Sequence, residues 1–183
     1  MTINLFDDAS WMSLRPLTFT RPVADLRIGI LTIAEKWAKY LKADFGFQTQ
    51  DYLSVKFAPK PNADLFINGS ICPDEALLNA ISDLKAGEAL YKRDIVVAYI
   101  ADQHDLEAVK SLKQIEYPGD FIQIVYPEHI FGNNPAEIRK DFKLLTEGRS
   151  SAKLSSTNQL LGDDIFLEEI GRASCRERVL AGV

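Results

Sequence analysis

The segment ALYKRDIVVAYIA, residues 89–101, decides the class of fold that this sequence predicts. An apolar run ends at Tyr91, Arg93 and Asp94 follow as polar turn residues, and a second apolar run continues to Ala101. This order predicts a β-hairpin. Because the second run is almost continuously apolar, both of its faces should be buried, as in the middle of a sheet. We therefore expect residues 95–101 to form a central strand.

Helical and strand patterns alternate on both sides of this segment. Apolar residues recur at spacings of three and four from Leu26 to Leu41, which is typical of an amphipathic helix with Trp37 on its buried face. We expect further helices at residues 73–81, 105–113 and 135–146, and strands at 3–6, 51–57, 64–67, near 115 and at 121–125. This alternation predicts an α/β fold with three layers, in which helices flank a mostly parallel sheet.

The composition excludes several classes of protein. The formal net charge is -5, so no overall positive field would hold a nucleic acid. The acidic N-terminus does not resemble a signal peptide, and no stretch reaches the roughly 18 apolar residues of a membrane span. We therefore expect a cytoplasmic protein that binds neither nucleic acid nor membrane. In that compartment Cys72 and Cys175 should both be reduced thiols.

The sequence changes character near its C-terminal end. Residues 1–149 carry the α/β pattern, and residues 150–158, SSAKLSSTN, are small and polar, which is typical of a linker. Residues 159–168 are too short to pack alone, so we expect them to begin a second domain. Residues 169–183, EIGRASCRERVLAGV, follow no period and resemble the translation of a sequencing adapter. A non-native tail is therefore predicted there, the alternative being a basic, disordered C-terminus.

The common catalytic motifs are absent from the sequence. It contains no G-x-S-x-G, H-E-x-x-H, C-x-x-C or G-x-x-x-x-G-K-[ST] pattern. The two histidines, His104 and His129, have no ligand-like spacing to a cysteine or to each other, and we expect both on the surface. Hydrolase and zinc chemistry are not indicated.

The strongest chemical signal is LRPLTFTRPVADLRIG, residues 14–29. It combines guanidinium and hydroxyl groups before the expected helix, and these groups are Arg15, Thr18, Thr20, Arg21 and Arg27. Guanidinium forks and helix N-termini both suit phosphate oxygens. The carboxylates of Asp7, Asp8 and Asp25 could hold a divalent cation opposite such a phosphate. The alternative is that the arginines pair with these aspartates in surface salt bridges.

A family resemblance is carried by this segment and by others in the same order. Residues 14–18, LRPLT, with the following Arg21-Pro22, resemble the signature loop of sugar-1-phosphate nucleotidyltransferases. Together with EKW, INGSICPD, VVAY, IRKDF and LSSTNQLLGDDIFLE, they resemble bacterial proteins similar to the bifunctional UDP-N-acetylglucosamine pyrophosphorylase/glucosamine-1-phosphate acetyltransferase. The resemblance spans residues 3–168.

The resemblance implies a Rossmann-like nucleotidyltransferase fold, with a nucleoside triphosphate and a sugar 1-phosphate as substrates and Mg²⁺ as cofactor. Arg21 and Arg15 would be catalytic, and Asp7 and Asp8 would hold the metal. Substrate-binding groups would be Thr18, Thr20, Arg27, Asn68 and Gly69. Residues 159–168 would begin a left-handed β-helix, through which the whole protein would form a homo-oligomer. A role in cell-envelope biosynthesis would follow.

One part of the family pattern is missing. Related transferases carry a G-G-x-G-T-R loop before L-x-P-L-T, whereas this chain has DDASWMS and no glycine before Gly29. A backbone cradle for a triphosphate depends on such glycines. Two interpretations therefore stay open: an active transferase, or a degenerate domain that binds a nucleotide sugar or regulates an attached acyltransferase.

Overall fold

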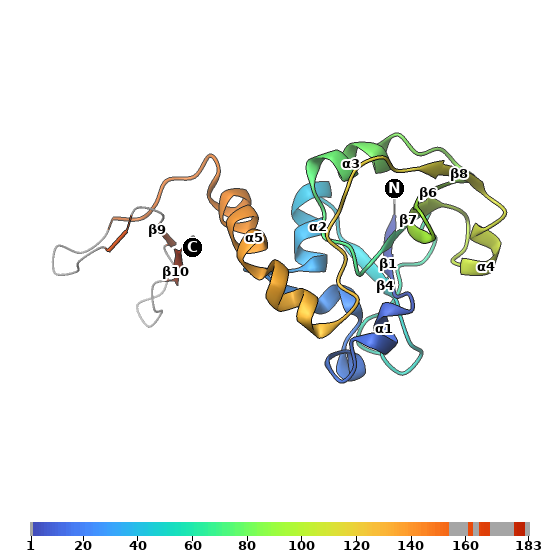
Figure 1. The fold of residues 1–183 in the computed structure, drawn as a ribbon, viewed down its shortest axis with the longest axis horizontal. Coiled ribbons are helices and arrows are strands. Elements are labelled where there is room, and N and C mark those ends of the chain that lie inside the picture. The colour runs from blue at the N-terminus through green and yellow to red at the C-terminus, as the bar shows by residue number, and fades with distance from the viewer. Residues whose placement is uncertain (1, 154–160, 163–164, 169–177, 182–183) are drawn as a thin grey trace.

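The computed structural model describes residues 2–153, 161–162, 165–168 and 178–181. Its main feature is a six-stranded sheet with the order β4-β1-β5-β7-β6-β8. The strands are β1 (Ile3–Phe6), β4 (Phe45–Gln48), β5 (Leu65–Asn68), β6 (Glu88–Lys92), β7 (Ile95–Ile100) and β8 (Lys113–Glu116). Figure 1 shows helices packed around this sheet.

The strand directions confirm the α/β fold expected from the sequence. β1 runs parallel to β4 and β5, and β6 runs parallel to β8, whereas β7 is antiparallel to both of its neighbours. Five strands of this sheet therefore point the same way. The predicted hairpin is also confirmed, since β6 and β7 pair directly and β7 lies inside the sheet.

Two apolar clusters cover the two faces of the sheet. One contains Ile3 and Leu5 of β1 and packs against α2 (Ile33–Leu41) and α3 (Glu75–Ser82) through Trp37 and Leu77. The other contains Phe6 and packs against α4 (Leu106–Val109). Alternate residues of β1 thus face opposite layers, as a strand period of two requires. No helix among the described residues is long and apolar enough to span a bilayer.

The helix expected from Leu26 to Leu41 begins only at Ile33. A 3-10 turn, η2 (Val23–Asp25), is followed by a small hairpin of β2 (Arg27–Ile28) and β3 (Leu31–Thr32). Gly29 has a φ of 78°, which suits the hairpin turn and not a helix. Thr32 then caps α2, because its side chain accepts from Glu35 N–H while the Glu35 carboxylate accepts from Thr32 N–H.

Four other expected elements differ from the structure. Residues 51–57 form turns rather than a strand, and 121–125 form only a bridge between Gln123 and Ile71. The helix expected at 105–113 is the single turn α4. The last helix, α5 (Pro127–Thr146), begins eight residues before Pro135, where we expected it to start. Proline is common at a first helical turn, and here Pro127 takes that place.

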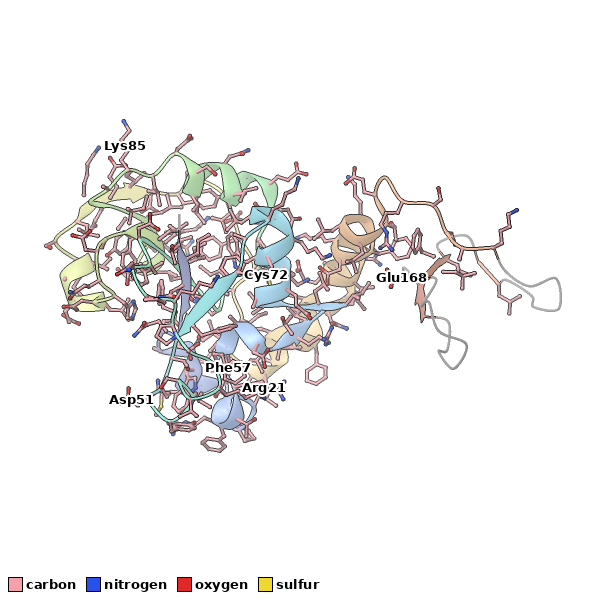
Figure 2. All side chains as sticks on the ribbon, turned by 180° about the vertical axis from the view of Figure 1, so that it is seen from behind. Arg21, Asp51, Phe57, Cys72, Lys85 and Glu168 are labelled. Carbon is pink, nitrogen blue, oxygen red and sulfur yellow. The ribbon has the colours of Figure 1, made fainter. Side chains whose placement is uncertain are left out.

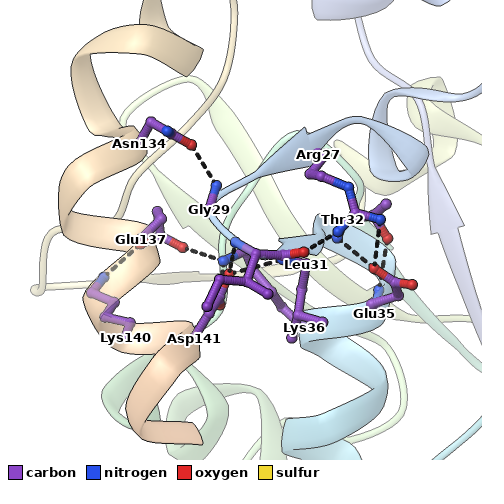
Figure 3. Close-up of polar contacts among 11 residues, drawn as sticks. Arg27, Gly29, Leu31, Thr32, Glu35, Lys36, Asn134, Glu137, Lys140 and Asp141 are labelled. Carbon is purple, nitrogen blue, oxygen red and sulfur yellow. Dashed lines mark hydrogen bonds and ion pairs between the residues drawn. The ribbon is translucent and has the colours of Figure 1, made fainter. Parts of the chain in front are cut away.

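A buried ionic cluster joins α5 to α2 and to the β2–β3 hairpin (Figure 3). Lys36 is 1% exposed and pairs with Asp141 and, at 2.9 Å, with Glu137. The other carboxylate oxygen of Asp141 accepts the N–H groups of Ile30 and Leu31 at 2.8 and 3.0 Å. The sequence pattern gave no sign of this cluster, because its charges lie far apart along the chain.

Helix α5 also lies close to the turn of the β2–β3 hairpin. Asn134 accepts the Gly29 N–H at 2.7 Å, and a Cβ at Gly29 would lie 2.5 Å from Asp141 Oδ2. Glycine is therefore required at this position for space as well as for its positive φ. These buried contacts fix the end of the arginine-bearing segment, residues 14–29, relative to α5.

The C-terminal predictions fall partly outside the described residues. Residues 150–153 have no regular structure, and residues 154–160 and 163–164 are not described, so the linker at 150–158 stays a prediction. β9 (Ile165–Glu168) pairs antiparallel with β10 (Arg178–Ala181). Most of the predicted non-native tail, residues 169–177 and 182–183, is likewise not described, so its origin and the β-helix stay predictions.

Candidate functional site

Polar side chains meet where β1 and β5 end at the same edge of the sheet. Phe6 pairs with Asn68 in the register, and Asp8 follows on the loop after β1. Asp8 Oδ2 accepts from the Asn68 amide at 2.8 Å, and Gln123 Nε2 lies 3.5 Å from the same oxygen. In open α/β sheets, ligands bind outside the carboxyl ends of the strands. This edge is therefore the candidate functional site.

Asn68 and Gly69 form the floor of the site and are not its lining. Asn68 is 1% exposed, and its amide also donates to Val96 O at 3.0 Å, while its carbonyl accepts from Ser70. Gly69 is buried, and a Cβ there would lie 3.1 Å from Ala24 Cβ. In this conformation Asn68 orients Asp8 and Gly69 allows close packing, so the substrate contacts expected of both residues stay predictions.

The loop after β1 folds back over the end of that strand. Asp7 Oδ1 accepts the Val23 N–H at 2.9 Å, and Asp7 Oδ2 accepts the Thr49 hydroxyl at 2.5 Å. Thr18 is fully buried, and its hydroxyl donates to Trp11 O at 2.7 Å. The predicted phosphate contact is thus not available to Thr18 in this conformation. Asp7 and Thr18 instead fix the shape of the loop.

The arginine predicted to support catalysis, Arg15, is held by aromatic rings. Its guanidinium carbon lies 4.4 Å from the ring centre of Trp11 and 5.4 Å from that of Phe19. Such stacking leaves the edge of a guanidinium group free to donate hydrogen bonds. Arg15 is exposed, so this donor edge faces solvent.

Arg21 is exposed and only loosely paired. Its guanidinium lies 3.8 Å from the Asp25 carboxylate, and its side chain is 47% exposed. Burial raises the pKa of Asp25, which opposes the ionic pair. Thr20, beside Arg21, is also exposed. Figure 2 shows Arg21 at the same end of the molecule as Asp51 and Phe57, far from Lys85.

Arg27 is engaged by the hairpin. Its guanidinium donates to Ile30 O and lies 3.7 Å from the Glu35 carboxylate. Arg27 therefore makes a surface salt bridge, but with Glu35 and not with one of the aspartates named in the alternative interpretation. Arg21 does lie beside one of those aspartates, Asp25. Arg15 has no carboxylate partner among the described residues.

The aspartates do not fit a metal site formed by this chain alone. Magnesium prefers six oxygen ligands in octahedral geometry. Both oxygens of Asp7 accept hydrogen bonds from the protein, and so do both oxygens of Asp8, from Ser10 N–H and Asn68. In the part of the chain that the structure describes, no three metal-ligating side chains converge. The Mg²⁺ that the resemblance implies stays a prediction.

Asp7→Asn is expected to stabilise the protein at pH 7.5. Burial raises the pKa of Asp7 to about 6 from 3.8. The folded state thus binds this proton more tightly than the unfolded state, so wild-type stability rises as the pH falls from above 6 toward 3.8. In asparagine the carbonyl can still accept the Val23 N–H, and the uncharged NH2 can donate to the Thr49 hydroxyl, which accepts in place of donating. The substitution should therefore add about 1–3 kcal/mol at neutral pH.

Urea denaturation at pH 7.5 and pH 5 measures this effect, with the exposed Asp51→Asn as the control. The gain from Asp7→Asn should shrink at pH 5, where the wild-type carboxyl is largely protonated. A variant less stable than wild type at pH 7.5 would show that the Asp7 charge is needed by the fold.

Sequence reasoning missed one residue of this site, Gln123. Its amide donates to Ser70 Oγ at 3.0 Å, and it reaches the site because residues 121–125 run beside residues 70–72, just after β5, through the bridge to Ile71. Nothing in its sequence neighbourhood distinguishes it. Only the tertiary contact identifies it.

The two histidines expected on the surface are both half-buried. His104 packs against Phe66 and forms a hydrogen bond with the Tyr99 hydroxyl through Nδ1, on the face of the sheet that α4 covers. Burial lowers the pKa of His104. His129 accepts the Val125 N–H through Nδ1 at 3.1 Å. Cys72 is buried, and burial raises the pKa of its thiol.

Comparison with known proteins identifies the family to which the chain belongs. No curated protein matches the sequence. The family model described as sugar nucleotidyl transferase matches residues 3–150, which cover the whole sheet and all three arginines of the loop. The fold and the edge site agree with this match. The chain therefore belongs to the sugar nucleotidyl transferase family.

Proposed function

We propose that this chain transfers a nucleotidyl group from a nucleoside triphosphate to a sugar 1-phosphate. The observation that carries the proposal is the pair of exposed guanidinium groups, Arg15 and Arg21, on a loop that folds over the carboxyl end of β1. Membership of the family supports the same general chemistry. Two exposed guanidinium groups at this edge of the sheet suit a polyphosphate.

In the proposed reaction an oxygen of the sugar phosphate attacks the α-phosphorus. The bond from this phosphorus to the bridging oxygen breaks, and pyrophosphate leaves with the electron pair. Negative charge grows on the leaving group, so a cation fixed beside it lowers the barrier. Arg21 is loosely paired and can turn toward the phosphates, whereas Arg15 is held in place by Trp11 and Phe19.

The competing proposal is a degenerate domain that binds a nucleotide sugar or regulates an attached acyltransferase. The observation in its favour is the loop itself. Residues 9–15, ASWMSLR, contain no glycine, and Ser10 to Ser13 form the short helix α1. A loop of this kind offers fewer free N–H groups to a triphosphate than a glycine-rich one.

Further properties belong to the same proposal. We infer a cytoplasmic location from the composition, and homo-oligomers through a β-helix that would follow residue 159. UDP-N-acetylglucosamine as product, and a role in the cell envelope, follow only from the resemblance of segments such as INGSICPD.

A panel assay tests the proposal. The protein is incubated with each nucleoside triphosphate, magnesium and a set of sugar 1-phosphates, and pyrophosphate release is followed. Release with one pair supports transfer. No release with any pair, together with measurable binding of a nucleotide sugar, would favour the degenerate domain.

A further inference from the structure

A cavity of about 310 Å³ opens beside the candidate site. Gln123 lines it and also reaches Ser70 and Asp8 of the site through its amide. Lys92 and Arg93 line it from the end of β6. β6 runs in the same direction as β1 and β5, since β5 and β6 are both antiparallel to β7. The cavity and the candidate site therefore lie on the same edge of the sheet.

The charge in this cavity is opposite in sign to that of the whole chain. Lys92 and Arg93 supply two positive charges, and Asp120, which pairs with Lys92 at 2.6 Å, supplies one negative charge. The whole chain has a net charge of -5. Asp120 is fully exposed, so solvent screens it more than the groups beneath. The cavity thus favours an anion.

Arg93 is held in an unusual backbone conformation. Its φ is 55°, in the left-handed region that a long side chain adopts with some strain. Its N–H donates to the Glu116 carboxylate at 3.1 Å, which holds the turn. Its guanidinium, by contrast, makes no ion pair or hydrogen bond to a described residue. The turn therefore presents a free guanidinium at the cavity.

His129 adds a neutral donor from the first turn of α5. Because Nδ1 accepts the Val125 N–H at 3.1 Å, the ring proton lies on Nε2. The first turn of this helix of 20 residues also carries the positive end of the helix dipole. Phe121 and Ile95 supply an apolar wall, and an aromatic face of this kind suits the C–H groups of a sugar ring.

We propose that this cavity binds the phosphorylated sugar, with Arg93 and His129 donating to its phosphate and Phe121 facing its ring. The inference rests on the function proposed above. The volume is near the lower limit of small-molecule sites, which suits a monosaccharide phosphate better than a nucleotide. The nucleoside triphosphate would then take the side of the site that carries Arg15 and Arg21.

Calorimetric titration tests the proposal on the full chain. The probes are glucose 1-phosphate and N-acetylglucosamine 1-phosphate, each alone and with α,β-methylene analogues of the nucleoside triphosphates. Glucose and inorganic phosphate are comparison ligands. Arg93→Asn suits the left-handed backbone, and in His129→Asn the amide carbonyl can replace Nδ1 as acceptor. Lys85→Gln removes an exposed charge elsewhere and serves as the matched control.

Arg93→Asn and His129→Asn should each weaken binding of the sugar 1-phosphate about tenfold. Both variants should bind the nucleotide analogues within about twofold of the wild-type affinity. Lys85→Gln should bind every probe like wild type. Equal affinity of wild type, Arg93→Asn and His129→Asn for the sugar 1-phosphates would overturn the proposal. Failure of wild type to bind either sugar 1-phosphate would also overturn it.

Pyrophosphate release separates this inference from the function on which it rests. Binding that depends on Arg93, without pyrophosphate release, would support the cavity and refute transfer. Release with an unchanged KM for sugar 1-phosphate in both variants would support transfer and refute the cavity. Circular dichroism of each variant confirms that the fold is intact.

Discussion

Arg21→Ala is expected to lower the rate of pyrophosphate release about 100-fold, which corresponds to a barrier about 2.7 kcal/mol higher. Arg21 is exposed and lies 3.8 Å from its nearest carboxylate, so its removal breaks no strong contact of the fold. The substitution should therefore lower the reaction rate and leave the stability of the fold almost unchanged. Pyrophosphate release under saturating substrates measures the effect, and urea denaturation should show a stability change below about 0.5 kcal/mol.

Lys85→Ala is the matched control for Arg21→Ala. Both side chains are exposed cations, but Lys85 lies at the opposite end of the molecule (Figure 2). The control should keep the wild-type rate, since a change in net charge alone has a small effect at physiological salt. If Arg21→Ala and Lys85→Ala react equally fast, the phosphate role given to Arg21 is wrong.

Asp141→Ala is expected to destabilise the fold by about 3–4 kcal/mol. The variant leaves the Lys36 ammonium with Glu137 as its remaining partner, at 2.9 Å, in a buried position. It also leaves the N–H groups of Ile30 and Leu31 without their acceptor. Both losses occur away from water, where unpaired polar groups cost most.

Urea denaturation measures this loss against Lys143→Ala, an exposed change on the same helix that should cost less than about 0.5 kcal/mol. Asp141→Asn should fall between wild type and alanine, because its carbonyl can still accept the hairpin N–H groups. A cost below about 1 kcal/mol for Asp141→Ala would mean that Glu137 alone suffices to neutralise Lys36, and would contradict the stabilising role given to Asp141.

The sequence alone predicted the features of the fold that depend on the pattern of apolar residues. The run at residues 95–101 predicted an interior strand, and β7 occupies that position. Trp37, expected on a buried helical face, is 0% exposed. In both cases local hydrophobicity decides the environment of the residue, so the pattern carries the information.

The sequence alone did not predict features that depend on backbone geometry or on contacts between residues far apart along the chain. Apolar spacing from Leu26 to Leu41 suggested one helix, but Gly29 turns the chain and lets α5 approach it. Thr18 and Asn68 were predicted to contact the substrate, but both are buried and make tertiary hydrogen bonds in this conformation. Gln123 reaches the site from more than 50 residues along the chain, a contact that no local pattern predicts.

Formation of a nucleotide sugar tests the central claim most directly. The wild-type protein, a nucleoside triphosphate, a sugar 1-phosphate and magnesium are followed together by ³¹P nuclear magnetic resonance. The account predicts that diphosphate resonances of a nucleotide sugar grow at the same rate as pyrophosphate, and that Arg21→Ala slows both about 100-fold. Nucleotide-sugar resonances that stay absent with every substrate pair, while the protein is folded and binds nucleotide sugar, would contradict it.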